Sequence, residues 1–215
     1  MSGFQCYNNA GKLTIDSDNR AIVMSQMKAM GNISNIGYYR FNSAFGDGAP
    51  LGTLAYQFFP ANGLRWFQLQ TNGKYCFPGA KLYEPGTGRF MISSNTTALT
   101  SGYLDVRNAS GNLIWSAASA GTMPRIRGFF TIPAGHNLGT VLTVTSPFAD
   151  PWICISQCVG NISDDGTVVG YSGILIKRNS STSFSLQYIN QYQMNYTQAM
   201  GSAQVQIALA SFTGY

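Results

Sequence analysis

Short runs of alternating apolar and polar residues fill most of the chain, and each run ends at residues that favour turns. The first run passes through Phe4 and Cys6, and a break at Asn8-Asn9-Ala10-Gly11 separates it from a second run through Leu13 and Ile15. Alternation of period two is typical of half-buried β-strands. The break predicts a type I turn closed by a glycine in the left-handed region. We therefore expect a β-hairpin at the start of the chain.

Similar turn signals recur along the rest of the sequence at intervals of about eight to twelve residues. Asn72-Gly73 lies between the apolar runs Phe67–Gln70 and Tyr75–Phe77, and this dipeptide predicts a two-residue hairpin. Asp164-Asp165-Gly166 and Asn179-Ser180-Ser181 interrupt later apolar runs. We expect turns between strands at both places.

One segment, Asn19–Met30, fits two kinds of secondary structure. Val23, Met27 and Met30 fit one face of a helix, but the consecutive apolar residues Ile22-Val23-Met24 are typical of a buried strand, which we favour. The pattern as a whole predicts an all-β fold with little helix. We expect an antiparallel β-sandwich of the jelly-roll or immunoglobulin-like kind, built as one large unit or two small ones.

The first hairpin pattern returns one hundred positions later. FQCYNNAGKLTID at residues 4–16 aligns with LDVRNASGNLIWS at residues 104–116, and both follow the pattern apolar-x-apolar-x-Asn-x-x-Gly-x-Leu. Either the two segments converged on a good turn, or two similar units were fused near the Ser/Thr/Asn-rich stretch 94–101. The sequence thus suggests a β-sandwich unit at 1–100, with 101–215 as a second β unit or a continuation of the same sandwich.

Charged residues are scarce: they make up 10% of the 215 residues, and Glu84 is the only glutamate, whereas about 25% is usual. Surfaces made of Asn, Gln, Ser, Thr and Gly suit permanent protein contacts better than life as a free monomer. The net charge of +5 comes mainly from missing acids. We interpret the basic pairs Arg125/Arg127 and Lys177/Arg178 as solvated strand ends and expect no nucleic-acid partner.

The sequence contains none of the usual targeting signals. No apolar stretch approaches the roughly 18 residues of a transmembrane helix. The N-terminus has neither the basic nor the apolar region of a secretion signal. We therefore expect synthesis in a cytoplasm and no insertion into a membrane.

Candidate catalytic groups are few. Nearly all eight acidic residues lie beside Gly, Asn, Ser or Pro, which marks them as turn and strand-end residues, whereas a glycan-cleaving enzyme would need two converging carboxylates. The only histidine, His136, lies in an expected turn. Cys154 and Cys158 have the wrong spacing for zinc, and we expect Cys6, Cys76 and these two to be free, mostly buried thiols. We predict no enzymatic activity, no metal and no cofactor.

Aromatic residues are the remaining candidates for a functional surface, because they are too numerous for one core of this size. In a strand, the adjacent pairs Trp66-Phe67 and Phe129-Phe130 must point to opposite faces. One member of each pair then faces a second layer, a neighbouring subunit or a ligand. A subunit interface is the favoured interpretation, and a glycan-binding face is the alternative. The candidate residues are Trp66, Phe67, Phe129, Phe130, Tyr188, Tyr192 and Tyr196.

The opening residues carry a recognisable motif. They read Gly3-Phe4-Gln5-Cys6-Tyr7-Asn8, then, after two small or polar residues, Gly11-Lys12-Leu13-Thr14-Ile15-Asp16-Ser17. This run resembles the start of a family of small, β-rich proteins of tailed bacteriophages, over about the first twenty residues. Cys6 stands where that family usually has Val, and the motif contains no catalytic residue.

The resemblance implies a function, because members of that family are encoded among tail genes and are generally tail or virion structural proteins. It implies a structural component of the phage tail, near the tip or a fibre, which assembles in the bacterial cytoplasm and leaves by lysis. The implied partners are other tail proteins and further copies of the chain. The alternative is a module displayed on the tail that binds a glycan or protein of the host surface.

Overall fold

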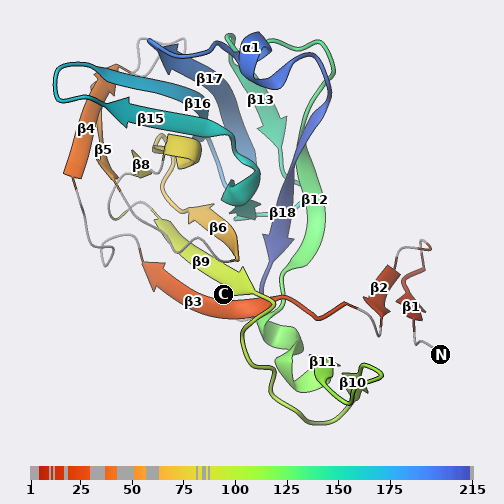
Figure 1. Ribbon diagram of the computed structural model, residues 1–215. Helices are drawn as coiled ribbons and strands as arrows, with labels where there is room; N and C mark the ends of the chain where they lie inside the picture. The colour runs from red at the N-terminus through yellow and green to blue at the C-terminus, as the bar shows by residue number, and fades with distance from the viewer. Residues whose placement is uncertain are drawn as a thin grey trace.

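The computed structural model describes residues 5–9, 11, 13–16, 19–29, 37–42, 51–56, 63–80, 82–83, 86 and 88–213. Over these residues the chain forms an antiparallel β-sandwich, as the sequence pattern predicts (Figure 1). Two small two-stranded sheets stand beside the sandwich. Phe4, where the first hairpin was expected to begin, and Met30, the end of the ambiguous segment, lie outside the described residues.

The first large sheet has six strands in the described part of the chain. Their order across the sheet is β12 (Arg125–Ile132), β18 (Val205–Ser211), β14 (Trp152–Cys154), β6 (Leu64–Leu69), β9 (Gly88–Ser94) and β3 (Val23–Ala29). Strand β3 confirms the strand interpretation of the segment after Asn19. Its apolar run pairs with β9, so packing within the sheet overrides the helix-like spacing.

The second large sheet has eight strands among the described residues. Seven follow one path: β13 (Leu142–Thr145), β17 (Ser183–Gln191), β16 (Val169–Arg178), β7 (Tyr75–Phe77), β8 (Leu82–Tyr83), β5 (Leu51–Tyr56) and β4 (Gly37–Asn42). The eighth, β15 (Gly160–Asp164), pairs with the first half of β16, whereas β7 pairs with its last half. The expected turns 164–166 and 179–181 are confirmed, because they join β15 to β16 and β16 to β17.

Both large sheets combine strands from either side of residue 100. In the first sheet, β14 pairs with β6 through Ile153 and Phe67. In the second, β16 pairs with β7 through Ile176 and Cys76. The two halves of the chain therefore share their sheets, as a continuous sandwich requires. Short helices connect the strands: the 3₁₀ helices η2 (Pro78–Ala80), η3 (Ala117–Thr122) and η4 (Ile155–Gln157), and α1 (Tyr196–Met200).

The main core lies between the two sheets, and a smaller cluster lies on the opposite face of the first sheet. Alternation along the strands separates the two, because neighbouring residues point to opposite faces. The main core includes Phe67, Phe90, Phe130, Ile153, Ile174, Ile176, Phe184, Leu186 and Leu209. The second cluster consists of Trp66, Met91, Trp152, Cys154, Ala208, Ala210 and Phe212. Three of the four cysteines are buried, and all four are free thiols.

The expected two-residue hairpin at Asn72-Gly73 is wrong. The turn forms, with Gly73 at φ +79°, but β6 and β7 on either side of it belong to different sheets. The backbone of Gly73 and Lys74 pairs with that of Arg178 instead. The Gly73 N–H donates to the Arg178 carbonyl at 2.7 Å, and the Arg178 N–H donates to the Lys74 carbonyl at 3.0 Å. The chain thus crosses from one sheet to the other at this turn.

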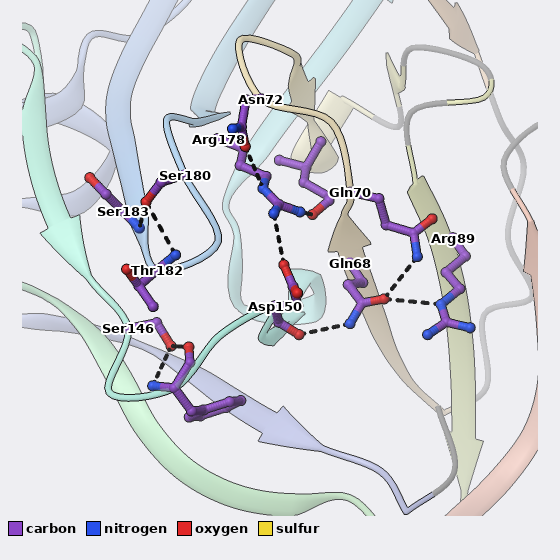
Figure 2. Close-up of polar contacts among 12 residues, drawn as sticks. Gln68, Gln70, Asn72, Arg89, Ser146, Asp150, Arg178, Ser180, Thr182 and Ser183 are labelled. Atoms are coloured by element: carbon purple, nitrogen blue, oxygen red, sulfur yellow. Dashed lines mark hydrogen bonds and ion pairs between the residues drawn. The ribbon is translucent and has the colours of Figure 1, made fainter.

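The side chain of Arg178 holds that crossing in place (Figure 2). Its Nη1 donates to the carbonyl of Leu69 at 2.5 Å and its Nε donates to Asn72 Oδ1 at 3.0 Å. Its Nη2 lies 2.8 Å from Asp150 Oδ1. Arg178 is only 7% exposed, so its interpretation as a solvated strand end is wrong. A buried guanidinium is tolerated because each of its nitrogens has a partner.

The network continues from Asp150 into the first sheet. Gln68 Nε2 donates to the Asp150 carbonyl at 2.7 Å, and Gln68 Oε1 accepts from Arg89 Nε at 3.0 Å. The Arg89 guanidinium lies 5.2 Å from the centre of the Trp152 ring, within cation–π range. A continuous polar path therefore connects the two sheets at this end of the sandwich.

Replacing Arg178 should destabilise the sandwich more than replacing an exposed arginine. Arg178→Met removes the ion pair and leaves the Leu69 carbonyl and Asn72 without their partner, so we expect a loss of about 2–4 kcal/mol in the free energy of unfolding. Arg125→Met, on the exposed part of β12, should change it by less than about 0.5 kcal/mol. Urea denaturation of the two variants checks this, and equal effects would contradict it.

Candidate functional site

The structure places five of the seven candidate aromatics inside the chain. Phe67 and Phe130 lie between the sheets, Trp66 lies in the cluster on the opposite face, and Tyr188 and Tyr196 are buried in the main core. Their aromatic surface is used for packing within the chain and is not offered to a partner. Phe129 and Tyr192 are exposed. The pairs Trp66-Phe67 and Phe129-Phe130 do point to opposite faces, as strand geometry predicts.

Phe129 lies on β12, an edge strand of the first sheet. It is about half exposed, and Ile126 on the same strand is exposed to a similar degree. The Arg127 guanidinium between them lies 4.5 Å from the centre of the Phe148 ring. An edge strand with exposed apolar side chains is a plausible contact surface for another protein.

The three tyrosines spaced four residues apart gather at one end of the second sheet. The rings of Tyr188 on β17 and Tyr196 on α1 pack edge to face, with their centres 5.5 Å apart. Between them the chain turns, and Tyr192 lies on this turn with 77% of its surface exposed. In the sequence the three looked equivalent, but only Tyr192 is displayed.

A pocket of about 430 Å³ opens beside this turn. We call it the tyrosine pocket. It lies where β15, β16, β17 and α1 meet, towards the end of the molecule that carries α1 in Figure 1. Its volume falls in the range of roughly 300–1,000 Å³ that is usual for small-molecule sites. Its lining residues are Val159, Gly160, Asn161, Ser172, Tyr188, Gln193, Met194 and Ala199.

Gln193 fixes the turn that carries Tyr192. Its Oε1 accepts from Ser172 Oγ on β16, and its Nε2 donates to Ser163 Oγ on β15, both at 3.0 Å. Its backbone carbonyl accepts from Asn190 Nδ2 at 3.1 Å. The turn is therefore attached to three strands by side-chain hydrogen bonds, and it has a defined shape without a ligand.

The helix after the turn is fixed as well. Asn195 caps α1 by accepting from the Gln198 N–H, and the Gln198 side chain accepts from the Asn195 N–H, both at 3.0 Å. This reciprocal arrangement is a capping box. On the other side of the pocket, a Cβ at Gly160 would lie 2.9 Å from the Cα of Gly79, so only glycine permits this approach. Specific contacts therefore define the pocket wall on both sides.

The backbone of Tyr192 is strained. Its φ is +55°, in the left-handed region that bulky side chains avoid. One other tyrosine shares this property: Tyr103 has φ +62° and is fully exposed. Strain of this kind persists where the surroundings impose it, and it is common at binding sites.

Among the described residues, none that lines the tyrosine pocket is charged. Its polar lining residues are Asn161, Ser172, Tyr188 and Gln193, and Asn161 is exposed to solvent. Burial raises the pKa of the neighbouring Tyr196 phenol, which is therefore neutral at physiological pH. The described lining residues can offer hydrogen bonds and apolar contact, but no ionic bond.

The second candidate surface is the pair of small hairpins, which the structure builds alike. β1 (Gln5–Tyr7) and β2 (Leu13–Asp16) pair in the same register as β10 (Asp105–Arg107) and β11 (Leu113–Ser116), with an irregularity at the same place. In both loops a glycine at positive φ, Gly11 or Gly111, donates its N–H to the asparagine carbonyl three residues earlier at 2.9 Å. The sequence echo therefore is a structural one.

The two hairpins form one unit outside the sandwich, which we call the hairpin pair (Figure 1). The Ala21 N–H, just after the first hairpin, donates to the Ile114 carbonyl of the second at 2.7 Å. A cavity of about 210 Å³ lies between them, bordered by residues that include Ile15, Arg20 and Trp115. Four large apolar side chains are exposed on this unit or directly before it: Tyr7, Leu13, Tyr103 and Leu104.

The acidic residues that the structure describes lie in turns or at strand ends, as predicted. Asp165 accepts hydrogen bonds from the Val168 N–H and from the hydroxyl and N–H of Thr167, which lower its pKa to about 2. Asp105 accepts from the Ser101 hydroxyl and the Gly102 N–H, which lower its pKa. Carboxylates held in the charged form are poor general acids. Among the described residues, no group of three or more His, Cys, Asp and Glu could hold a metal.

Sequence reasoning identified Tyr188 and Tyr192 but missed the polar half of the tyrosine pocket. Asn161, Ser172 and Gln193 come from three separate segments and have no shared motif. The only sequence signal for this polar half was Gln193, because it directly follows a tyrosine at the end of a predicted strand.

No helix of the described residues is long and apolar enough to cross a membrane.

Comparison with known proteins gives a family for the chain. The model of a domain of unknown function, DUF8377, matches residues 1–214, so the chain belongs to this family. No curated protein and no solved structure matches the chain.

The strain at Tyr192 gives a testable prediction on stability. Tyr192→Gly should raise the free energy of unfolding by about 0.5–1 kcal/mol, because glycine adopts this φ without a steric penalty. Tyr171, whose φ is not in the left-handed region, provides the comparison, since Tyr171→Gly should destabilise the chain. Thermal unfolding of both variants measures the difference. A clear loss of stability in Tyr192→Gly would show that its ring is needed for packing.

Proposed function

We propose that this member of the DUF8377 family is a structural protein of the tail of a tailed bacteriophage, near the tip or a fibre. It assembles with copies of itself and with other tail proteins in the bacterial cytoplasm, and it carries out no catalysis. The observation that carries the proposal is the hairpin pair, which stands outside the sandwich and has four large exposed apolar side chains on it or directly before it.

Exposed apolar side chains on a projecting unit favour a protein partner. Tyr103 and Leu104 are adjacent, and Tyr103 is fully exposed. Clustered apolar surface of this kind marks interaction sites, and aromatic residues are enriched at the centres of interfaces. The few charges of the chain support the same function, because the surface has little charge repulsion to keep copies apart.

The identity of the partner rests on the phage resemblance. The matching residues, Gly3 to Ser17, include both strands of the first hairpin. The part of the chain that resembles phage tail proteins is thus also part of the exposed unit. This coincidence supports a role of the hairpin pair in assembly into the tail.

The proposal predicts that the chain is present in virus particles and enters them through the hairpin pair. Mass spectrometry of purified particles should detect it. When the chain carries the double substitution Tyr103→Ser with Leu104→Ser, the amount of it incorporated per particle should fall by at least about tenfold, as expected for loss of a central apolar contact. Val168→Ser removes an exposed apolar side chain from the β15–β16 turn and should leave incorporation unchanged.

Two results would contradict the proposal. One is the absence of the chain from purified particles of the virus that encodes it. The other is normal incorporation of the doubly substituted chain, because the assembly contact would then lie elsewhere. Circular dichroism of the purified variants shows whether the sandwich is intact, so a folding defect is not mistaken for an assembly defect.

A further inference from the structure

We infer that the tyrosine pocket binds a neutral saccharide, with the exposed Tyr192 ring as the surface on which a sugar ring stacks. This inference goes beyond the proposed function and does not depend on it, because it rests on a different end of the molecule. In Figure 1 the two hairpins lie at the right and lower right, whereas α1 lies at the top. A chain attached by its hairpins would leave the pocket free.

The polar groups of the pocket select the class of ligand. The lining residues that the structure describes include amides and hydroxyls but no charged side chain. A phosphate or carboxylate ligand would have no counter-charge there and would lose its hydration on entering. A purely apolar ligand would form no hydrogen bond with the Asn161 and Gln193 amides that line the pocket. A neutral molecule rich in hydroxyl groups matches this set of donors and acceptors.

The hydrogen-bonding capacity of the pocket is adequate for such a ligand. Each oxygen and nitrogen of the Gln193 amide has one partner, which leaves the second hydrogen of Nε2 and a lone pair of Oε1 for a ligand. Asn161 is exposed at the pocket wall and can both donate and accept. Sugar hydroxyls also donate and accept, so they can pair with both amides at once.

Tyr192 supplies the apolar half of the recognition. It directly precedes the lining residues Gln193 and Met194, and its ring is 77% exposed. The C–H groups on one face of a pyranose carry a partial positive charge and pack against the negative face of an aromatic ring. Met194 is also exposed and extends the apolar surface beside the pocket. Tyr192 is not itself a lining residue, so the sugar stacks beside the pocket, next to Gln193, and its hydroxyls pair with the amides of the lining.

The turn has the shape needed before any ligand arrives. The Gln193 contacts to β15 and β16 and the capping box of α1 hold the Tyr192 backbone at positive φ. A preformed site loses little conformational entropy on binding. The strain is thus understandable if the outward direction of the Tyr192 ring is needed for a ligand.

The experiment is a titration of the isotope-labelled full chain with a panel of neutral hexose and N-acetylhexosamine oligosaccharides, followed by NMR. We expect a member of the panel to shift the side-chain amide signals of Asn161 and Gln193. Calorimetry with that oligosaccharide should show binding at least about tenfold weaker for Tyr192→Gly. Tyr192→Phe keeps the ring and should bind within about threefold of the unsubstituted chain.

The matched control is Tyr103→Gly, which removes the other exposed tyrosine at positive φ and should leave saccharide binding unchanged. Unfolding curves show that Tyr192→Gly is folded, so its loss of binding reports the ring. The inference is overturned if no neutral saccharide binds at about 10 mM, if Tyr192→Gly binds equally well, or if charged saccharides bind better than neutral ones. None of these results bears on incorporation of the chain into particles, so the two proposals fail separately.

Discussion

The buried guanidinium of Arg178 is the interaction on which the sandwich depends. It lies at the end of β16 in the second sheet, and it binds the last carbonyl of β6 in the first sheet. Asp150, just before β14, supplies the counter-charge. A charge removed from water is costly unless it is paired and fully hydrogen-bonded. The three segments must therefore meet at this point for the structure to form, and their meeting fixes the crossing between sheets.

The register of the neighbouring strands follows from this point. Arg178 pairs with Phe184 at the start of β17, and in the same ladder Ile174 lies opposite Tyr188. A slip by one residue would turn Tyr188 away from the core and would move Ser172 away from Gln193. The tyrosine pocket is thus held by a contact at the far end of the same two strands. This is why a site made of residues from several segments can be rigid.

Local features of the fold could be predicted from the sequence, because local residues determine them. The strands follow period-two alternation, the described acidic residues lie in turns or at strand ends, and the loops closed by Gly11 and Gly111 match. Asn72-Gly73 was misinterpreted because a turn signal specifies the bend of the chain and not the partner of each strand. That partner depends on Arg178, which is 106 residues away from Asn72. No local pattern contains such a contact.

The candidate site could be predicted only in part, because it also depends on contacts between distant segments. Regular spacing identified Tyr188, Tyr192 and Tyr196, but it could not show that two of them pack together and that the third is excluded by a turn. The amides around them come from distant segments. The burial of a side chain depends on all of its neighbours in space, whereas a single sequence shows only the residues directly before and after it in the chain.

The choice of residues at strained positions carries information about function. In the described part of the chain, ten glycines and three other residues have positive φ, and two of those three are the tyrosines at positions 103 and 192. The sequence thus usually has glycine where the backbone is left-handed, and glycine would be less strained than tyrosine at positions 103 and 192. Both tyrosines are among the most exposed side chains, so packing does not account for them. A ring that costs stability and contributes no packing is best explained by contact with another molecule.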